Sequence, residues 1–157
     1  MEQLDCGYEV NCWVKDALEY VPDKIRQEWS NKLSFVCTSR SDGRRLTRNF
    51  RDGREIIILS ERIIPRPRSD EGSSDFRYFV YVVLHEIAHA INDDLGQNEI
   101  SDKENQAQEL RADSLAFEWF NHRIEQRNIP ALRPLTQDEV TRAQQKTGAM
   151  MSAALSD

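Results

Sequence analysis

The sequence predicts an α+β fold in one domain, with N-terminal helices, a small and mainly antiparallel sheet, two long helices and a C-terminal helix. Three observations support this prediction. A chain of 157 residues has the usual length of a single domain. Short β-branched segments lie in its first half, and longer helical segments with capping signals follow them. Hydrophobic residues make up 39% of the chain, which is enough for one modest core.

The first part of the chain is expected to contain two short helices and a strand. Both helices fall within the first thirty residues, and Pro22 suits the first turn of the second. Ile25 and Trp29 then lie one helical turn apart. The segment Leu33–Thr38 is rich in β-branched and aromatic residues, and this composition predicts a strand.

A β-hairpin is predicted next in the sequence. Residues 44–50 and 54–60 flank Asp52-Gly53, a dipeptide typical of two-residue hairpin turns. The second arm is continuously apolar at its centre, which indicates that both of its faces are covered. Residues 65–74 contain Pro, Gly and Ser and predict a loop.

The central helix is predicted over residues 76–92, with Ser74 or Asp75 as its cap and Gly96 as a stop signal. Apolar residues occur on nearly every side of this segment. A helix that is apolar all round lies in the centre of its domain. We therefore expect this helix to be buried.

Two capping-box patterns predict the remaining helices. The first, Ser101–Glu104, begins a helix that runs to about Arg127. The second, Thr136–Glu139, begins a C-terminal helix over about residues 136–155. The buried candidates on the first of these helices are Leu110, Ala112, Leu115, Ala116, Trp119 and Phe120.

Charge and cysteine content limit the classes of protein that the chain can belong to. The net charge is −6, so affinity for nucleic acid is not expected. The acidic start lacks the pattern of a secretory signal, and no apolar run is long enough to span a membrane. Cys6, Cys12 and Cys37 have no C-x-x-C spacing, which argues against a disulfide framework or a four-cysteine zinc site. These features predict a cytoplasmic protein.

Two of the three histidines, His85 and His89, lie four positions apart inside the apolar helix. Residues at i and i+4 are about 40° apart around a helix, so both imidazoles point the same way and can bind one ion. Glu86 is turned about 100° from His85, so it lies beside the ion. This is the H-E-x-x-H arrangement. Two core histidines bonded to backbone would be the alternative, but burying them with a carboxylate on a central helix is costly.

A third metal ligand is expected on the next predicted helix. Catalytic zinc takes three ligands from protein and leaves one position for water. Glu109 lies twenty residues after His89 and is the expected third ligand of one Zn²⁺. Asp113 follows one turn later and is expected to accept the remaining ring N–H of a ligating histidine, most simply His85. The alternative is that Glu109 lies on a solvated helix face, because its neighbours are also polar.

The motif His85-Glu86-x-x-His89 followed by Glu109-x-x-x-Asp113 resembles the gluzincin branch of the zincin metallopeptidases, with thermolysin-like ligand order and spacing. The small size of the chain and the Glu-Leu-Arg-Ala-Asp-Ser-Leu-Ala context are similar to those of the ImmA/IrrE-type small metallopeptidases and the minimal gluzincins.

This resemblance covers about residues 55–120. It implies a single zincin-like metallopeptidase domain over residues 1–157, with a motif-bearing core at about 33–128. It also implies an edge strand before the active helix that can align substrate backbone. Residues 55–60 match that strand by position.

The resemblance further implies a zinc-dependent endopeptidase that acts on an intracellular protein or peptide, such as a transcriptional repressor. Zinc would activate a water and polarise the scissile carbonyl. Glu86 would take the proton of the water and deliver it to the leaving amine.

An oxyanion donor is usual in such a site, but the sequence does not single one out. A continuous helix turns His122 about 140° from the face of Glu109, so His122 is expected to be a surface residue. The tyrosines qualify only through tertiary structure: Tyr8, Tyr20, Tyr78 and Tyr81.

A catalytically inactive, zinc-stabilised interaction module is the alternative function. Residues 44–68 contain eight arginines against three acidic residues, opposite in sign to the chain as a whole. This basic segment predicts either a docking surface for an acidic partner or a hairpin whose edge is protected by charge.

Overall fold

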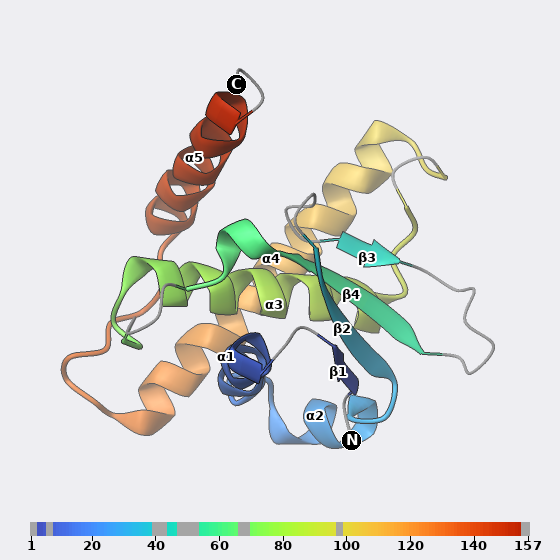
Figure 1. Ribbon diagram of the computed structural model, residues 1–157. Helices are drawn as coiled ribbons and strands as arrows, with labels where there is room; N and C mark the ends of the chain where they lie inside the picture. The colour runs from blue at the N-terminus through green and yellow to red at the C-terminus, as the bar shows by residue number, and fades with distance from the viewer. Residues whose placement is uncertain are drawn as a thin grey trace.

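The computed structural model describes residues 3–5, 8–38, 44–46, 54–65, 70–96 and 99–154, with side chains for residues 9–38, 54–65, 70–96 and 99–148. A sheet and five α-helices form this part of the chain, as the α+β prediction requires (Figure 1). The elements in order are β1 (Gln3–Asp5), α1 (Tyr8–Leu18), α2 (Asp23–Trp29), β2 (Leu33–Thr38), β3 (Arg44–Leu46), β4 (Glu55–Ser60), the 3₁₀ turn η1 (Glu61–Ile63), α3 (Ser74–Asn92), α4 (Asp102–Arg127) and α5 (Gln137–Ala154).

The sheet is mainly parallel, so the prediction of a mainly antiparallel sheet is wrong. Its strand order is β1-β2-β4-β3. Both β1 with β2 and β2 with β4 pair in parallel, and only β3 with β4 is antiparallel. The sequence signals around Asp52-Gly53 are local, so they predict only the antiparallel pairing of β3 with β4. The parallel pairing of β2 with β4 joins residues 22 positions apart, such as Leu33 with Glu55, and has no local signal.

The position of β4 in the sheet also differs from the expectation. Since β4 lies between β2 and β3, it is an interior strand and not the edge strand that the resemblance implied. Its interior position agrees with its apolar sequence, and Ile57 and Leu59 are fully buried. The edge beyond β4 is formed by β3. The expected turn at Asp52-Gly53 lies outside the described residues.

The N-terminal prediction is confirmed for both helices and for β2. Pro22 immediately precedes α2, as its fixed φ favours. The strand β1 was not predicted. It has only three residues, and it forms because it can pair with the edge of β2.

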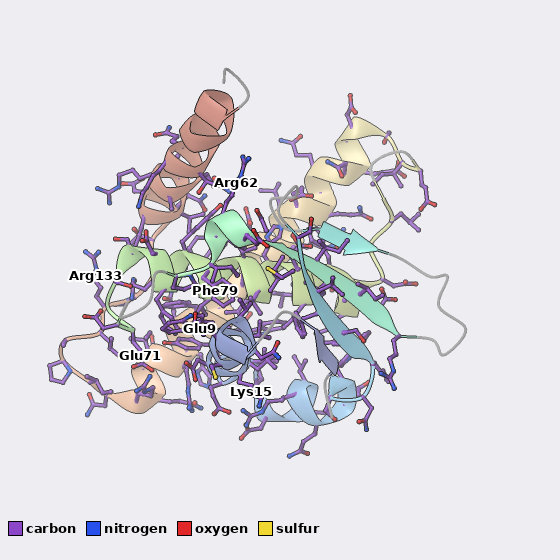
Figure 2. The ribbon with its side chains drawn as sticks, in the orientation of Figure 1. Glu9, Lys15, Arg62, Glu71, Phe79 and Arg133 are labelled. Carbon is purple, nitrogen blue, oxygen red and sulfur yellow. The ribbon has the colours of Figure 1, made fainter. Side chains whose placement is uncertain are left out.

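The helix α3 packs against α1, α4, α5 and the sheet, which explains why nearly all of its faces are apolar (Figure 1). Phe79 is fully buried in the centre of the molecule (Figure 2). The cap is Ser73, whose hydroxyl accepts a hydrogen bond from the Phe76 amide at 3.2 Å, in place of Ser74 or Asp75. The helix ends at Asp93, which has a left-handed conformation (φ 55°), before Gly96.

The helix α4 begins at the predicted capping box, in which Ser101 and Glu104 each satisfy a backbone amide of the other. It ends where Asn128 adopts a left-handed conformation. The small residue Ala112 is fully buried where α4 meets α3. Leu110 is 62% exposed, so its predicted burial is wrong. It lies on the solvated side of the helix, away from α3.

A buried ion pair joins α5 to α3. Arg77 is 1% exposed, and its Nε donates to Glu139 Oε1 at 2.7 Å. Its remaining nitrogens donate to Glu139 Oε2 and to the carbonyls of Arg133 and Pro134. The predicted capping box at Thr136 is therefore half formed. The Thr136 hydroxyl accepts from the Glu139 amide, but the Glu139 carboxylate binds Arg77.

None of the helices in the described ranges combines the length and apolar character needed to cross a membrane.

Candidate metal centre

Three side chains from two helices converge at the centre of the molecule. His85 and His89 lie on α3, and Glu109 lies on α4, the helix that packs along α3. One ligand atom from each of the three lies within 4.8 Å of the others. The Nε2 atoms of the two imidazoles are 3.0 Å apart. Glu109 Oε2 lies 3.3 Å from His85 Nε2, and Glu109 Oε1 lies 3.6 Å from His89 Nε2.

These separations fit the ligand shell of a small metal ion. Ligands bound at 2.0–2.1 Å in a tetrahedron lie about 3.3–3.4 Å from one another. Both imidazoles are largely buried, with side chains 14% and 12% exposed, while Glu109 is 45% exposed. The three residues could therefore hold one metal ion without rearrangement of the helices.

The contacts of the two Nδ1 atoms also indicate that His85 and His89 can bind one metal ion. His85 Nδ1 lies 2.9 Å from Asp113 Oδ1, a close contact although it is poorly aligned for a hydrogen bond. His89 Nδ1 lies 2.8 Å from Asp94 Oδ2. A carboxylate beside Nδ1 favours the proton on that nitrogen, so each Nε2 presents its lone pair to the other. Two lone pairs 3.0 Å apart repel each other, and either a metal ion or a proton between them relieves that repulsion.

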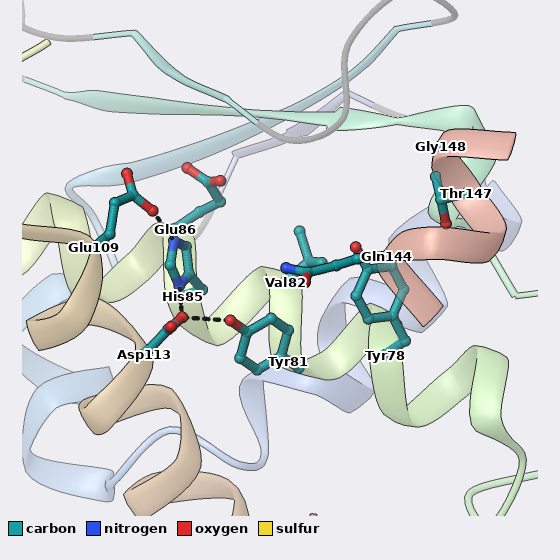
Figure 3. Close-up of a pocket in the computed structure, with 10 residues that line it drawn as sticks. All are labelled: Tyr78, Tyr81, Val82, His85, Glu86, Glu109, Asp113, Gln144, Thr147 and Gly148. Carbon is teal, nitrogen blue, oxygen red and sulfur yellow. Dashed lines mark hydrogen bonds and ion pairs between the residues drawn. The ribbon is translucent and has the colours of Figure 1, made fainter. Parts of the chain in front are cut away.

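Asp113 is placed where the sequence predicted it, beside His85. Its carboxylate also accepts a short hydrogen bond from the Tyr81 hydroxyl. The Tyr81 ring contacts the His85 ring, with centroids 5.7 Å apart (Figure 3). Tyr81 is 3% exposed and holds Asp113 against the imidazole.

Asp94 is a further contact residue; from the sequence, Asp93 and Asp94 could be partners of the ligands but are more often a simple polar helix end. The left-handed turn at Asp93 directs the chain back, so that Asp94 reaches His89 from the end of α3. The Asp94 side chain is 4% exposed, and its Oδ1 forms an ion pair with the Arg111 guanidinium of α4 at 2.9 Å. Only an acidic residue soon after the helix could have indicated this contact in the sequence.

The loop that carries Asp94 is held by a second residue of α4. The side-chain amide of Gln108 donates to the Leu95 carbonyl at 3.0 Å and accepts from the Leu95 amide at 2.9 Å. Gln108, Glu109 and Arg111 thus connect this loop and the two histidines to one face of α4.

The electrostatics of the cluster follow from these contacts. Burial lowers the pKa of His85, but the carboxylates of Asp113 and Glu109 outweigh burial and raise it to about 9. The pKa of His89 is also raised, because the contacts with Glu109 and Asp94 together outweigh burial and the neighbouring His85. In turn, the two imidazoles hold the pKa of Glu109 well below its usual range. In the metal-free protein a proton supplies the positive charge that this cluster favours.

Glu86 lies beside the three ligands on the wall of a cleft of about 390 Å³ (Figure 3). Residues of three helices line this cleft: Tyr78, Tyr81, Val82, His85, Glu86, Glu109, Asp113, Gln144, Thr147 and Gly148. Because Glu86 is on α3 one position after His85, it faces the cleft while the imidazole faces Glu109. The cleft gives solvent and a ligand access to the cluster.

The structure narrows the choice of oxyanion donor. The Tyr81 hydroxyl is engaged by Asp113, and Tyr20 is 3% exposed and packs against Phe120, outside the cleft. His122 is exposed, as predicted, and contacts Gln126. Tyr78 is the remaining tyrosine on the cleft wall. The side chain of Tyr8 lies outside the described residues.

Only part of the cysteines and of the basic segment lies among the described residues. Cys12 is exposed and Cys37 is half-buried, and neither belongs to the metal-binding group. Cys6 lies outside the described residues. Most of the arginine side chains between residues 44 and 68 also lie outside them, so the predicted acidic partner remains a prediction.

Comparisons with protein-family models, with curated proteins and with solved structures found no match to this chain. The resemblance to the gluzincins therefore depends on the motif residues and their arrangement.

Proposed function

We propose that this chain is a zinc-dependent endopeptidase of the gluzincin type, acting on a protein or peptide. The observation that carries the proposal is the convergence of His85, His89 and Glu109 beside a cleft that Glu86 also lines. Two imidazoles and one carboxylate are a typical protein ligand set of catalytic zinc in peptidases. In the described residues no fourth protein side chain joins this group, and the cleft beside it would give water access to a bound zinc.

A zinc ion held there supplies a Lewis acid that polarises the scissile carbonyl and activates water at neutral pH. The Glu86 carboxylate accepts a proton from the attacking water as the new C–O bond forms. It then delivers that proton to the leaving amine as the C–N bond breaks. Asp113 and Asp94 hold the two imidazoles in the orientation that directs each Nε2 toward Glu109, where zinc would be held.

A repressor or other regulatory protein inside the cell is the substrate that the resemblance to ImmA/IrrE-type peptidases suggests. This part of the proposal depends on analogy with those enzymes.

An inactive zinc-stabilised interaction module is the second candidate. The observation that favours it is that Asp113 engages the Tyr81 hydroxyl, which leaves Tyr78, about two helical turns from His85, as the oxyanion candidate among the described residues of the cleft wall. Zinc would then stabilise α3 against α4 without hydrolysis.

The substitution Glu86→Gln distinguishes the two candidates. We expect the purified variant to retain about one zinc per chain by metal analysis, because Glu86 is not a ligand. We also expect it to lose cleavage of a proteome-derived peptide library by at least about 100-fold, the usual scale of a lost general base. Tight zinc binding without cleavage by the wild type would support the interaction module, and retained cleavage in the variant would refute the role of Glu86.

A further inference from the structure

We propose that α5 forms the pocket for a substrate side chain, in which Gln144 hydrogen-bonds an uncharged polar residue next to the scissile bond and Gly148 leaves the space for it. This inference rests on the proposed peptidase function and specifies the substrate of the same site.

The first step is the direction of the cleft. It runs along α3 from His85 and Glu86 back to Tyr78, seven residues or about 10 Å of helix. Opposite Tyr78 the wall is formed by α5, through Gln144, Thr147 and Gly148 (Figure 3). An extended peptide rises about 3.3 Å per residue, so the residue next to a carbonyl at the metal centre lies beside Val82, three residues or about 4.5 Å of helix before His85, which is the point that Gln144 reaches from α5 (Figure 3).

The second step is the hydrogen-bonding capacity of α5. Gln144 is exposed, and its amide has no hydrogen-bond partner among the described residues. Figure 3 shows it reaching from α5 across the cleft toward Val82. The Thr147 hydroxyl donates to the Ala143 carbonyl at 3.0 Å, which leaves its oxygen as an acceptor. One donor-acceptor amide and one acceptor oxygen match a side chain such as Gln, Asn, Ser or Thr.

The third step is charge. The carboxylates of Glu86, Glu109 and Asp113 line the other end of the cleft, and no Lys or Arg is among its described lining residues. These carboxylates would repel an acidic substrate side chain anywhere in the cleft. A basic side chain would lack an acidic partner beside Gln144, because the carboxylate of Asp75, in the adjoining hollow behind Tyr78 and Thr147, is paired with Lys146 at 3.0 Å. An uncharged polar side chain avoids both costs.

The fourth step is space. A Cβ built on Gly148 meets no atom of the described residues within 4 Å. A larger residue at this position therefore fits the helix without a clash but projects into the cleft. Gly148 sets the size of the pocket, and Gln144 sets its polarity.

Digestion of a proteome-derived peptide library by the zinc-loaded full chain tests this assignment, with cleavage sites read by mass spectrometry. For the wild type we expect one position next to the scissile bond to be enriched at least about threefold in Gln, Asn, Ser or Thr and depleted in Asp and Glu. The variant Gly148→Leu should shift that position to Gly, Ala and Ser. The variant Gln144→Leu should shift it to apolar residues of similar size.

Gly148→Ala is an intermediate step in pocket size. It raises helix propensity as Gly148→Leu does but adds only one methyl group, so its profile should lie between those of the wild type and Gly148→Leu. A second variant serves as the control. Gln145→Leu changes an exposed neighbour of Gln144 that is not on the cleft wall, and it should retain the wild-type profile. Circular dichroism and zinc content verify that each variant is folded and loaded.

The outcomes separate this inference from the function on which it rests. Cleavage with an unchanged profile in both Gly148→Leu and Gln144→Leu would overturn the role of α5 and leave the peptidase proposal standing. A wild-type preference for acidic or basic residues at that position would also overturn it. Failure of the loaded wild type to cleave any peptide would overturn the peptidase proposal and this inference with it.

Discussion

At the scale of single residues, the site depends on carboxylates that do not touch the metal position. Asp113 and Asp94 each contact the Nδ1 of one imidazole, and each is itself held by a second side chain, Tyr81 or Arg111. Such outer contacts orient a histidine ligand and raise its basicity. Two series of contacts therefore fix the imidazole positions: Tyr81 to Asp113 to His85, and Arg111 to Asp94 to His89.

Substitution of these outer carboxylates should weaken metal binding. We expect Asp94→Ala and Asp113→Ala each to lower zinc affinity by about 10–100-fold, because the imidazole loses the group that fixes its tautomer. Competition with a fluorescent zinc chelator measures the affinity. Glu118→Ala removes an exposed carboxylate of α4 and is the matched control, with no expected change. Equal affinities for all three variants would show that Asp94 and Asp113 do not position the ligands.

At the scale of elements, α3 and α4 carry the ligands, and α5 is joined to α3 by the Arg77–Glu139 pair. Arg77 is surrounded by apolar residues and lies 5.1 Å from the Phe120 ring centre, yet each of its terminal nitrogens has an acceptor. A buried ion pair contributes little net stability, but loss of one partner leaves a buried charge unpaired. The pair therefore fixes where α5 begins, and with it the far wall of the cleft.

Removal of Glu139 tests this connection. We expect Glu139→Ala to lower the free energy of unfolding by about 3–5 kcal/mol, the usual cost of an unpaired buried charge. Urea denaturation followed by circular dichroism measures it. The control Lys146→Ala removes an exposed ion pair with Asp75 and should cost about 0–1 kcal/mol. A cost for Glu139→Ala no larger than that of the control would contradict the described role of the pair.

At the scale of the whole molecule, the sequence predicts what is local and misses what depends on distant partners. Helix periodicity and capping residues predict α3 and α4, and the i, i+4 spacing of His85 and His89 predicts that both imidazoles point the same way. Glu109 reaches them through the packing of α4 on α3, and the sequence indicated it only because a zinc site needs a third ligand. The parallel strand order could not be predicted, since it depends on where β4 inserts between β2 and β3. The contact of Asp94 with His89 depends on a single left-handed residue, Asp93, which has no reliable sequence signal.

Metal binding should stabilise the whole fold, because the ligands come from two helices that pack against each other. Zinc at about 1,000 times its dissociation constant should raise the free energy of unfolding by about 4 kcal/mol. The melting temperature should therefore rise on zinc addition and fall with a chelator. Calorimetry of the wild type and of Glu109→Ala measures both effects. A melting temperature that is insensitive to zinc would argue against a site formed by the folded chain.

X-ray absorption at the zinc edge of the loaded full chain tests the central claim most directly, because it reports the ligand atoms themselves. We predict two imidazole nitrogens and light oxygen donors at about 2.0–2.2 Å, with loss of one imidazole in His85→Ala and in His89→Ala. A sulfur ligand at about 2.3 Å, as Cys12 or Cys37 would supply, or an unchanged spectrum in both variants, would contradict the account.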